Sequence, residues 1–478
     1  MNGSERTPKI LLGLEIHITI DSRKKIFNWE NTYQGDIPPN SQVGPWELGY
    51  LGVLPIINSE TIHLGLKLAA ALEMKISPVI LFDRKIYNYF DLPKGYQITQ
   101  QEVPFATNGY LPIVKENAIE KIPIKILQLE EDTAKSIYSE EGVKLDFNRA
   151  GNPLVELVTE PVFQQVETVL IFVKQLQNLL RYLDISQAKM ERGQFRIDLN
   201  FSLKFGDNYK TPRYEVKNLN SLANVEKALK HEISKHQLLF SQAKEPPISQ
   251  TLGFDEAKQT TITHREKVDY FYLPEFNIPP IKLKSKEIQE IRKKLPKLPW
   301  IYWEKVKEVD IKAANTLIKS PLLMKILDFL EKKGKFELKE SKNWTVFYLN
   351  YLSPNFESGD ASQFIKKWKS YFSLFEYWKE KKLGNEEINA IIRELKETKK
   401  TFSSLVKKYE KKTTINENLV ELELQNLWNA DLAKKITTER QKTQNYLLGQ
   451  IKRKFPDYSV PEIVPIIQKF LTEKEKKL

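Results

Sequence analysis

Hydrophobic and polar positions alternate with a period of two at several places in the first half of the chain. In 12–20 every even position is apolar, whereas Glu15 and His17 occupy odd positions. Segment 196–203 alternates in the same way, with Arg196 and Asp198 on its polar side. Successive side chains of a strand point to opposite faces of a sheet. Both segments are therefore predicted to be half-buried strands, and Glu15 and His17 to share one open face.

A third alternating segment covers 122–131. Its pattern predicts that Ile122, Ile124 and Ile126 share a face that runs on to Gln128 and Glu130. Strands with one apolar and one polar face are typical of an antiparallel sheet that has helices behind it and a site in front.

Apolar residues recur at helical spacing in 59–74 and 161–183, and both segments are predicted to be packing helices. The second half reads as long helices, since 14 of the 18 glycines stand at or before Gly253. Proline-rich 295–299 and basic 407–412 indicate boundaries. We therefore predict an α+β protein with a sheet domain at 1–294, an all-α domain at 295–405 and a small all-α tail at 406–478.

Composition narrows the function. The 74 Lys and Arg against 62 Asp and Glu give a net charge of +12, which indicates either a polyanionic partner or solvated lysine-rich faces. The absence of cysteine excludes disulfides, thiolate zinc sites and a cysteine nucleophile. No two of the five histidines have H-x₃-H spacing, so no zinc is expected. No apolar run approaches the length of a membrane span and no signal peptide is evident, so a cytoplasmic location is expected.

Acidic residues and one histidine stand on or beside the polar strand faces. They are Glu15 with His17, the run Glu130-Glu131-Asp132, and Glu156. Carboxylates with one imidazole and no thiol suit Mg²⁺ or Mn²⁺ better than zinc. The Glu15 and His17 pair alone is equally compatible with a hydrogen-bonded pair on a strand surface.

Basic residues that could hold nucleotide phosphates stand in the same half of the chain. They are Arg84, Lys85, Arg149, Arg196 and Lys217. No P-loop or Rossmann fingerprint is present, so an ATP site would have to be built on the sheet face with a metal. No G-x-S-x-G motif is present either, and we do not expect the chain to hydrolyse an amide by itself. The cluster Lys452, Arg453 and Lys454 suits RNA backbone contact or a solvated helix face.

Ten short strings are distributed along almost the whole chain. They are GLEIH at 13–17, PWELGYLGVL at 45–54, FDRK at 82–85, DLPKGYQ at 91–97, LEEDTAK at 129–135, DFNRAGNPLVE at 146–156, MERGQFRIDLNFS at 190–202, EVKNLNS at 215–221, DYFYLPE at 269–275 and YLLGQ at 446–450. In this order they resemble the strings of the GatB family, whose members belong to the aspartyl/glutamyl-tRNA amidotransferases.

The resemblance implies an N-terminal cradle similar to the glutamine synthetase catalytic fold. It implies that ATP phosphorylates the side-chain carboxylate of Glu-tRNA(Gln) or Asp-tRNA(Asn), and that ammonia then gives the amide. A separate amidase-like A subunit would supply the ammonia, a small C subunit would brace the pair, and the helical middle and basic tail would grip the tRNA. Whether one or both charged tRNAs are substrates stays open.

The resemblance also assigns roles to residues. It implies metal binding and catalysis by Glu15, His17, Glu131 and Glu156, with Glu130 as an alternative ligand. Phosphate contact is expected from Arg84 and Lys85, with Arg196 and Lys217 near the nucleotide, and tRNA contact from Lys452, Arg453 and Lys454.

The chain departs from the family pattern at several positions. Ile86, Asn88 and Phe90 interrupt the run expected after Arg84 and Lys85. Gln128 stands where the family has histidine, Ala134 where it has glycine, and Leu252, Gly253 and Phe271 stand where arginines are expected. Two rival functions stay open: a tRNA-binding scaffold that has lost catalysis, and a stand-alone ligase of small molecules. The retained acidic residues argue against the scaffold, and the basic tail against the small-molecule ligase.

Overall fold

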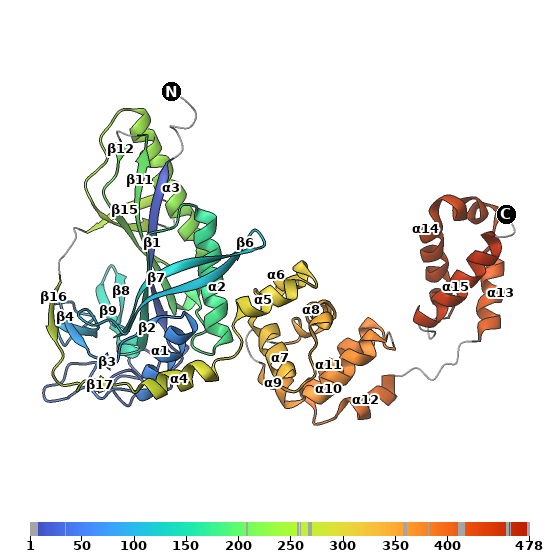
Figure 1. The fold of residues 1–478 in the computed structure, drawn as a ribbon, viewed down its shortest axis with the longest axis horizontal. Helices are drawn as coiled ribbons and strands as arrows, with labels where there is room; N and C mark the ends of the chain where they lie inside the picture. The colour runs from blue at the N-terminus through green and yellow to red at the C-terminus, as the bar shows by residue number, and fades with distance from the viewer. Residues whose placement is uncertain are drawn as a thin grey trace. The chain divides into compact units, whose positions relative to one another are not determined.

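The computed structural model describes residues 8–33, 35–206, 209–255, 258, 260–265, 270–356, 361–380, 382–409, 416–455, 458 and 460–475. The chain divides into two compact units, Met1–Met324 and Lys325–Leu478. The first contains strands and helices, and the second is mostly helical (Figure 1). A mixed N-terminal part followed by a mostly helical part confirms the coarse fold class. The predicted boundaries at 294/295 and 405/406 stay a prediction.

A ten-stranded sheet organises the first unit. Its strand order is β15 (Thr260–Arg265), β14 (Thr251–Asp255), β13 (Tyr214–Leu219), β11 (Phe195–Phe205), β1 (Lys9–Thr19), β10 (Pro153–Thr159), β7 (Ala118–Glu131), β6 (Ala106–Lys115) and β2 (Lys75–Ile76), and β12 (Tyr209–Lys210) pairs with β11. The central strand is β1, and Leu12, Leu14, Ile16 and Ile18 along it are all buried. The alternation predicted for this strand is confirmed.

The sheet is not purely antiparallel, and this corrects the prediction. Strands β13 and β14 run parallel, with Val216 opposite Leu252. Helix α3 (Leu222–Ser241) lies between them in the sequence. A helical crossover returns the chain to the same end of the sheet, so the next strand runs in the same direction. The pattern of apolar positions contained no signal for this crossover.

Helices pack against the apolar side of the sheet. Helices α1 (Ser59–Ala71) and α2 (Val166–Tyr182) fall within the two predicted helical segments. Helix α2 contacts β6, and α3 contacts β11, β13 and β15. A Cβ added at Gly65 of α1 would lie 3.1 Å from Leu129 of β7, so glycine allows the helix to approach the strand closely.

Smaller elements surround the large sheet. They are the three-stranded sheet of β16 (Phe271–Pro274), β4 (Asp83–Ile86) and β5 (Tyr96–Thr99), the pairs β3 (Val79–Ile80) with β17 (Ile281–Lys282) and β8 (Lys135–Ser139) with β9 (Gly142–Asp146), and the helices α4 (Ser285–Lys294), α5 (Pro299–Lys307) and α6 (Ile311–Leu317). The three-stranded sheet matters for the site, because β4 joins segments of the chain almost 190 residues apart by pairing Lys85 with Tyr272.

Aromatic and aliphatic clusters build the second unit. Its helices are α7 (Pro321–Lys332), which begins in the first unit, α8 (Ser341–Phe347), α9 (Ser362–Lys366), α10 (Trp368–Lys379), α11 (Asn385–Glu397), α12 (Phe402–Tyr409), α13 (Glu417–Leu427), α14 (Ala430–Lys454) and α15 (Val460–Glu475). Trp344 stacks on Phe375 with ring centres 3.9 Å apart. Leu424, Leu447 and Ile467 belong to a separate core formed by the last three helices.

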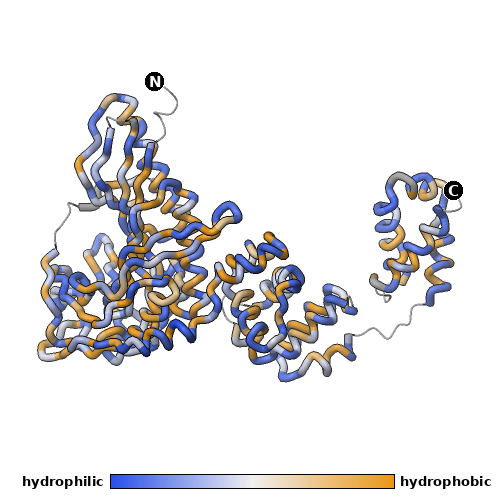
Figure 2. Tube along the Cα trace, viewed as in Figure 1, coloured by the Kyte–Doolittle hydropathy of each residue, from blue (hydrophilic) through white to orange (hydrophobic). Residues whose placement is uncertain are grey.

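Polar and apolar residues interleave along the helices of both units (Figure 2). Among the described residues, no helix combines the length and the apolar character that a membrane crossing requires.

Candidate active site

A cavity of about 1130 Å³ opens over the polar face of the large sheet. Strands β1, β7, β10 and β11 supply its floor. The polar floor residues are Glu15, His17, Gln128, Glu130, Glu156, Asp198, Asn200 and Ser202. The cavity therefore collects the polar positions that the alternation of β1 and β11 set apart.

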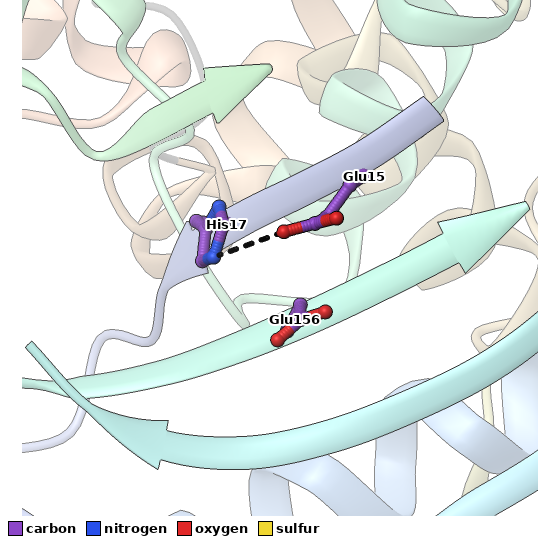
Figure 3. A group of neighbouring side chains, drawn as sticks. All are labelled: Glu15, His17 and Glu156. Carbon is purple, nitrogen blue, oxygen red and sulfur yellow. Dashed lines mark ion pairs between the residues drawn. The ribbon is translucent and has the colours of Figure 1, made fainter. Parts of the chain in front are cut away.

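Three of these side chains form a candidate metal site. Glu15, His17 and Glu156 can each offer one ligand atom, and those atoms lie within 4.8 Å of one another (Figure 3). Glu15 and His17 are two residues apart on β1, and the antiparallel register places Glu156 of β10 directly opposite His17. The register of two strands thus brings together residues about 140 positions apart in the sequence.

Glu130 of β7 adjoins this group, with Oε1 3.5 Å from Nε2 of His17. Burial and the nearby Asp198 raise the pKa of Glu15 to about 6. Burial raises the pKa of Glu130 to about 7, and burial together with Glu15 and Glu130 raises the pKa of Glu156 well above its ordinary value. Carboxylates this close cannot all hold a negative charge unless a cation is near, so the cluster favours cation binding.

His17 complements the carboxylates as a neutral ligand. Burial and the positive charge of Arg196, its cross-strand neighbour on β11, lower the pKa of His17 to about 4. The imidazole is therefore uncharged at neutral pH and keeps a lone pair on one ring nitrogen. Two carboxylates with a neutral imidazole and no sulfur fit a hard divalent cation such as Mg²⁺ or Mn²⁺.

Glu131 does not join this group, although the resemblance implied that it would. Both of its carboxylate oxygens accept from Nζ of Lys94, at 2.6 and 2.7 Å. They also accept from the backbone N–H of Ile98 at 3.0 Å and from the indole N–H of Trp46 at 3.2 Å. Adjacent residues of a strand point to opposite faces, so only one of Glu130 and Glu131 can face the cavity, and it is Glu130.

A bulge in β7 corrects a second expectation. Opposite β10, the pairing shifts between Ile126 and Ile124, which leaves Lys125 as an extra residue. Ile122 and Ile124 are consequently buried in the core, whereas Gln128 and Glu130 line the cavity. The predicted single face from Ile122 to Glu130 is wrong, because one inserted residue exchanges the two faces of a strand.

The predicted phosphate-binding residues separate into two groups. Lys85 and Lys217 line the cavity, with Lys217 2.7 Å from Glu215 and 3.1 Å from Asp198. Arg84 instead forms a bidentate pair with the buried Glu275, at 2.7 and 3.0 Å.

The other two arginines lie beside Asp132. Arg196 donates to Asp132 at 3.0 Å, and Arg149 lies 3.4 Å from the same carboxylate. Arg149 also donates to the carbonyl oxygens of Thr133 and Ala134, at 3.0 Å each. Neither arginine lines the cavity, so both are placed to support the strand ends beside it.

Sequence reasoning missed part of the cavity wall. The basic residues Lys125, Lys210 and Arg213 line it, as do Tyr87, Tyr89, Tyr270 and Tyr272. Tyr87 and Tyr89 continue the alternation that begins at Lys85, and this spacing was the available signal. The positions of the other two tyrosines are set by the pairing of β16 with β4, and no local sequence pattern indicates that pairing.

The departures from the family pattern lie in different environments. The amide of Gln128 donates to the carbonyl oxygen of Gln100 at the cavity floor. Ala134 and Leu252 are buried, and Gly253 pairs with Lys217 across β13 and β14. Phe271 is 65% exposed on β16.

The predicted tRNA-binding cluster ends helix α14 in the second unit. Lys452 donates to the carbonyl oxygen of Tyr458 at 3.0 Å, and Lys454 pairs with Glu423. Arg453 is exposed. Lys454 is exposed as well and Lys452 is half-buried, so Arg453 and Lys454 are both accessible to a partner.

Comparisons with known proteins identify relatives of this chain. Residues 10–289, which include every residue of the cavity, match the family described as "GatB/GatE catalytic domain". Three relatives are named as the B subunit of an aspartyl/glutamyl-tRNA(Asn/Gln) amidotransferase. The protein of Thermosipho melanesiensis is 34% identical over 454 residues, 91% of each chain. That of Mycoplasma mobile is 32% identical over 488 residues, 99% of this chain and 100% of the relative.

The third relative, from Mycoplasmopsis agalactiae, is 40% identical over 311 residues. That alignment covers 63% of this chain and 64% of the relative, so the chain spans less than two thirds of that protein's length in it.

Proposed function

This chain belongs to the GatB/GatE family, and on that premise we propose that it uses ATP to activate the side-chain carboxylate of glutamate or aspartate carried by a tRNA and then amidates it. The relatives are named for action on tRNA(Asn/Gln). A free carboxylate is a poor electrophile, and phosphorylation gives it a good leaving group. The products would be Gln-tRNA(Gln), Asn-tRNA(Asn) or both.

The observation that carries the proposal is the grouping of Glu15, His17 and Glu156 within 4.8 Å on the floor of the cavity. A scaffold that only presented tRNA would have no need for carboxylates gathered around a neutral histidine, because their mutual repulsion is unfavourable. The cluster therefore favours the catalytic function over the scaffold.

The chain's own residues divide the work. Glu15, His17 and Glu156 would hold Mg²⁺, with Glu130 beside them as a further oxygen donor. The bound metal would offset the negative charge that the triphosphate and the substrate carboxylate bring together. Lys85 and Lys217 lie in the same cavity and would bind phosphate oxygens.

Arg196 acts from beside the cavity, on the same sheet face as His17, because its positive charge disfavours protonation of His17. In this proposal Glu131 has a structural role, since its carboxylate binds Lys94. The proposal also includes a likeness of the N-terminal cradle to the glutamine synthetase catalytic fold, supported by strands with carboxylates on their open face.

The proposed complex has three protein subunits. An amidase-like A subunit would release ammonia and a small C subunit would brace the assembly. The mischarged tRNA would contact the helical second unit, including Arg453 and its neighbours at the end of α14. The net charge of +12 supports a polyanionic partner.

The test is to purify the chain with its two proposed protein partners and to assay Glu-tRNA(Gln) and Asp-tRNA(Asn) for ATP-dependent amidation. We expect amide formation with at least one of them, and its loss in Glu15→Gln with the complex still assembled. Tight tRNA binding without amidation would favour the scaffold. ATP-dependent amidation of free glutamate or aspartate without tRNA would favour the small-molecule ligase.

A further inference from the structure

Four tyrosines gather along one part of the cavity wall, and the site described above leaves them without a role. We call Tyr87, Tyr89, Tyr270 and Tyr272 the tyrosine cluster; all four line the cavity. The ring of Tyr87 lies 5.6 Å from that of Tyr89 and 5.4 Å from that of Tyr270, inclined by 68° and 60°. Rings at these angles are not stacked face to face, and Tyr89 is 45% exposed.

Lys85 connects the tyrosine cluster to the acidic floor. Its Nζ lies 4.4 Å from the ring centre of Tyr270 and 5.9 Å from that of Tyr87. Tyr272 is the cross-strand partner of Lys85, and Lys85 interacts electrostatically with Glu130 and Glu156. The wall therefore presents aromatic rings, then a cation, then a group of carboxylates suited to a metal.

This order matches the parts of a nucleotide bound to a metal. An aromatic ring can stack on a base, a lysine binds phosphate, and the carboxylates hold the cation that the phosphates share. The cavity, at about 1130 Å³, is also larger than the roughly 300–1,000 Å³ typical of a site for one small ligand. It has room for parts of two substrates.

We propose that the tyrosine cluster is a stacking surface for an adenine ring. The inference rests on the proposed function, in which two adenosines enter this cavity, that of ATP and the one at the 3′ end of the charged tRNA. Both sources offer the same chemistry, a purine base followed by a ribose and a phosphate. A role in packing alone is the alternative, and it gives no reason for Tyr89, a residue of the cavity lining, to be 45% exposed.

Tyr89 is the position we choose to substitute, because removing an exposed side chain should cost the fold little stability. Tyr89→Ala removes the ring, and Tyr89→Phe keeps the ring but removes the hydroxyl. Tyr138→Ala is the matched control, since Tyr138 lies on β8, is 73% exposed and does not line the cavity. Thermal unfolding of each assembled complex checks that the fold is unchanged.

Steady-state amidation by the assembled complex then gives KM for ATP and KM for the charged tRNA. We expect Tyr89→Ala to raise one of them about tenfold, equivalent to about 1.4 kcal/mol, with kcat within about twofold. Tyr89→Phe and Tyr138→Ala should stay within about twofold of the wild type. The KM that rises identifies the source of the adenine.

Two results would overturn the proposal. One is a Tyr89→Ala complex with both KM values within about twofold of the wild type. The other is an equal rise in Tyr89→Ala and Tyr89→Phe, which would assign the effect to the hydroxyl. If the wild-type complex shows no amidation, the proposed function fails. The role of the tyrosine cluster is then tested separately by equilibrium binding of ATP and of tRNA to the same variants: Tyr89→Ala should weaken one of the two affinities about tenfold, and the other variants should stay within about twofold of the wild type.

Discussion

Replacing Glu131 by glutamine tests a difference between the resemblance and the structure. The resemblance implies that Glu131 binds the metal, whereas the structure pairs it with Lys94. Lys94 is 5% exposed and Glu131 is 1% exposed, and both carboxylate oxygens accept from the Lys94 ammonium. Lys94 also lies 4.2 Å above the ring of Trp46. The substitution leaves a buried ammonium without its counter-charge.

The cost follows from this burial. Breaking one partner of a buried ion pair typically costs about 3–5 kcal/mol. Glutamine can still accept from the backbone N–H of Ile98, so we expect the lower end, about 3 kcal/mol. That loss lowers the folding equilibrium constant on the order of 10²-fold. Below the unfolding transition, amidation by the Glu131→Gln complex should stay within about twofold of the wild type, because Glu131 does not line the cavity.

For Glu156→Gln, at the candidate metal site, we expect the opposite: stability is kept and the response to Mg²⁺ is weakened. Burial, Glu15 and Glu130 raise the pKa of Glu156 well above its ordinary value, so its charge is unfavourable in the absence of a cation. The unfolding free energy measured in EDTA should therefore be unchanged or higher in this variant. The apparent affinity for Mg²⁺ in the amidation assay should fall at least about tenfold, since even the outer partners of metal ligands are worth that much.

Urea unfolding in EDTA gives the stabilities, and amidation titrated with Mg²⁺ gives the activities. Glu141→Gln is the matched control, because Glu141 is 81% exposed in the turn between β8 and β9 and should change the unfolding free energy by less than about 0.5 kcal/mol. The reasoning is refuted if Glu131→Gln loses Mg²⁺-dependent activity at unchanged stability, or if Glu156→Gln loses stability and keeps its Mg²⁺ response.

Three further results are expected. Because burial raises the pKa of Glu15 from 4.5 to about 6, Glu15 should contribute about 2 kcal/mol to a fall in folding stability as pH rises from 4.5 through 6 in EDTA, a fall to which Glu130 and Glu156 also contribute. Glu15→Gln should make this fall smaller in urea titrations, and an unaltered pH profile would contradict the assigned environment. Arg84→Ala should cost about 3 kcal/mol of stability by stranding Glu275, with KM for ATP within about twofold; a raised KM at unchanged stability would restore the phosphate role. Arg453→Glu should weaken tRNA binding in filter or fluorescence titrations and lower the salt slope by about 1, with KM for ATP unchanged; an unchanged tRNA affinity would remove Arg453 from the interface.

Much of the site was predictable from local pattern. The period of two in 12–20 set Glu15 and His17 on one face of β1 and buried the even positions, as the structure confirms. The same pattern placed Asp198 on the open face of β11. These predictions succeeded because a strand needs no distant information to decide which of its residues share a face.

The tertiary structure alone decided which of those faces meet. The register of β1 with β10 brought Glu156 opposite His17, and the extra residue Lys125 in β7 put Glu130 into the cavity while Glu131 turned to Lys94. Pairing of β16 with β4 completed the tyrosine wall in the same way. Local periodicity fixes the side of a strand on which a residue lies, but strand register, bulges and the partner of a long charged side chain are set by free-energy differences between contacts with remote segments, and no local pattern records those contacts.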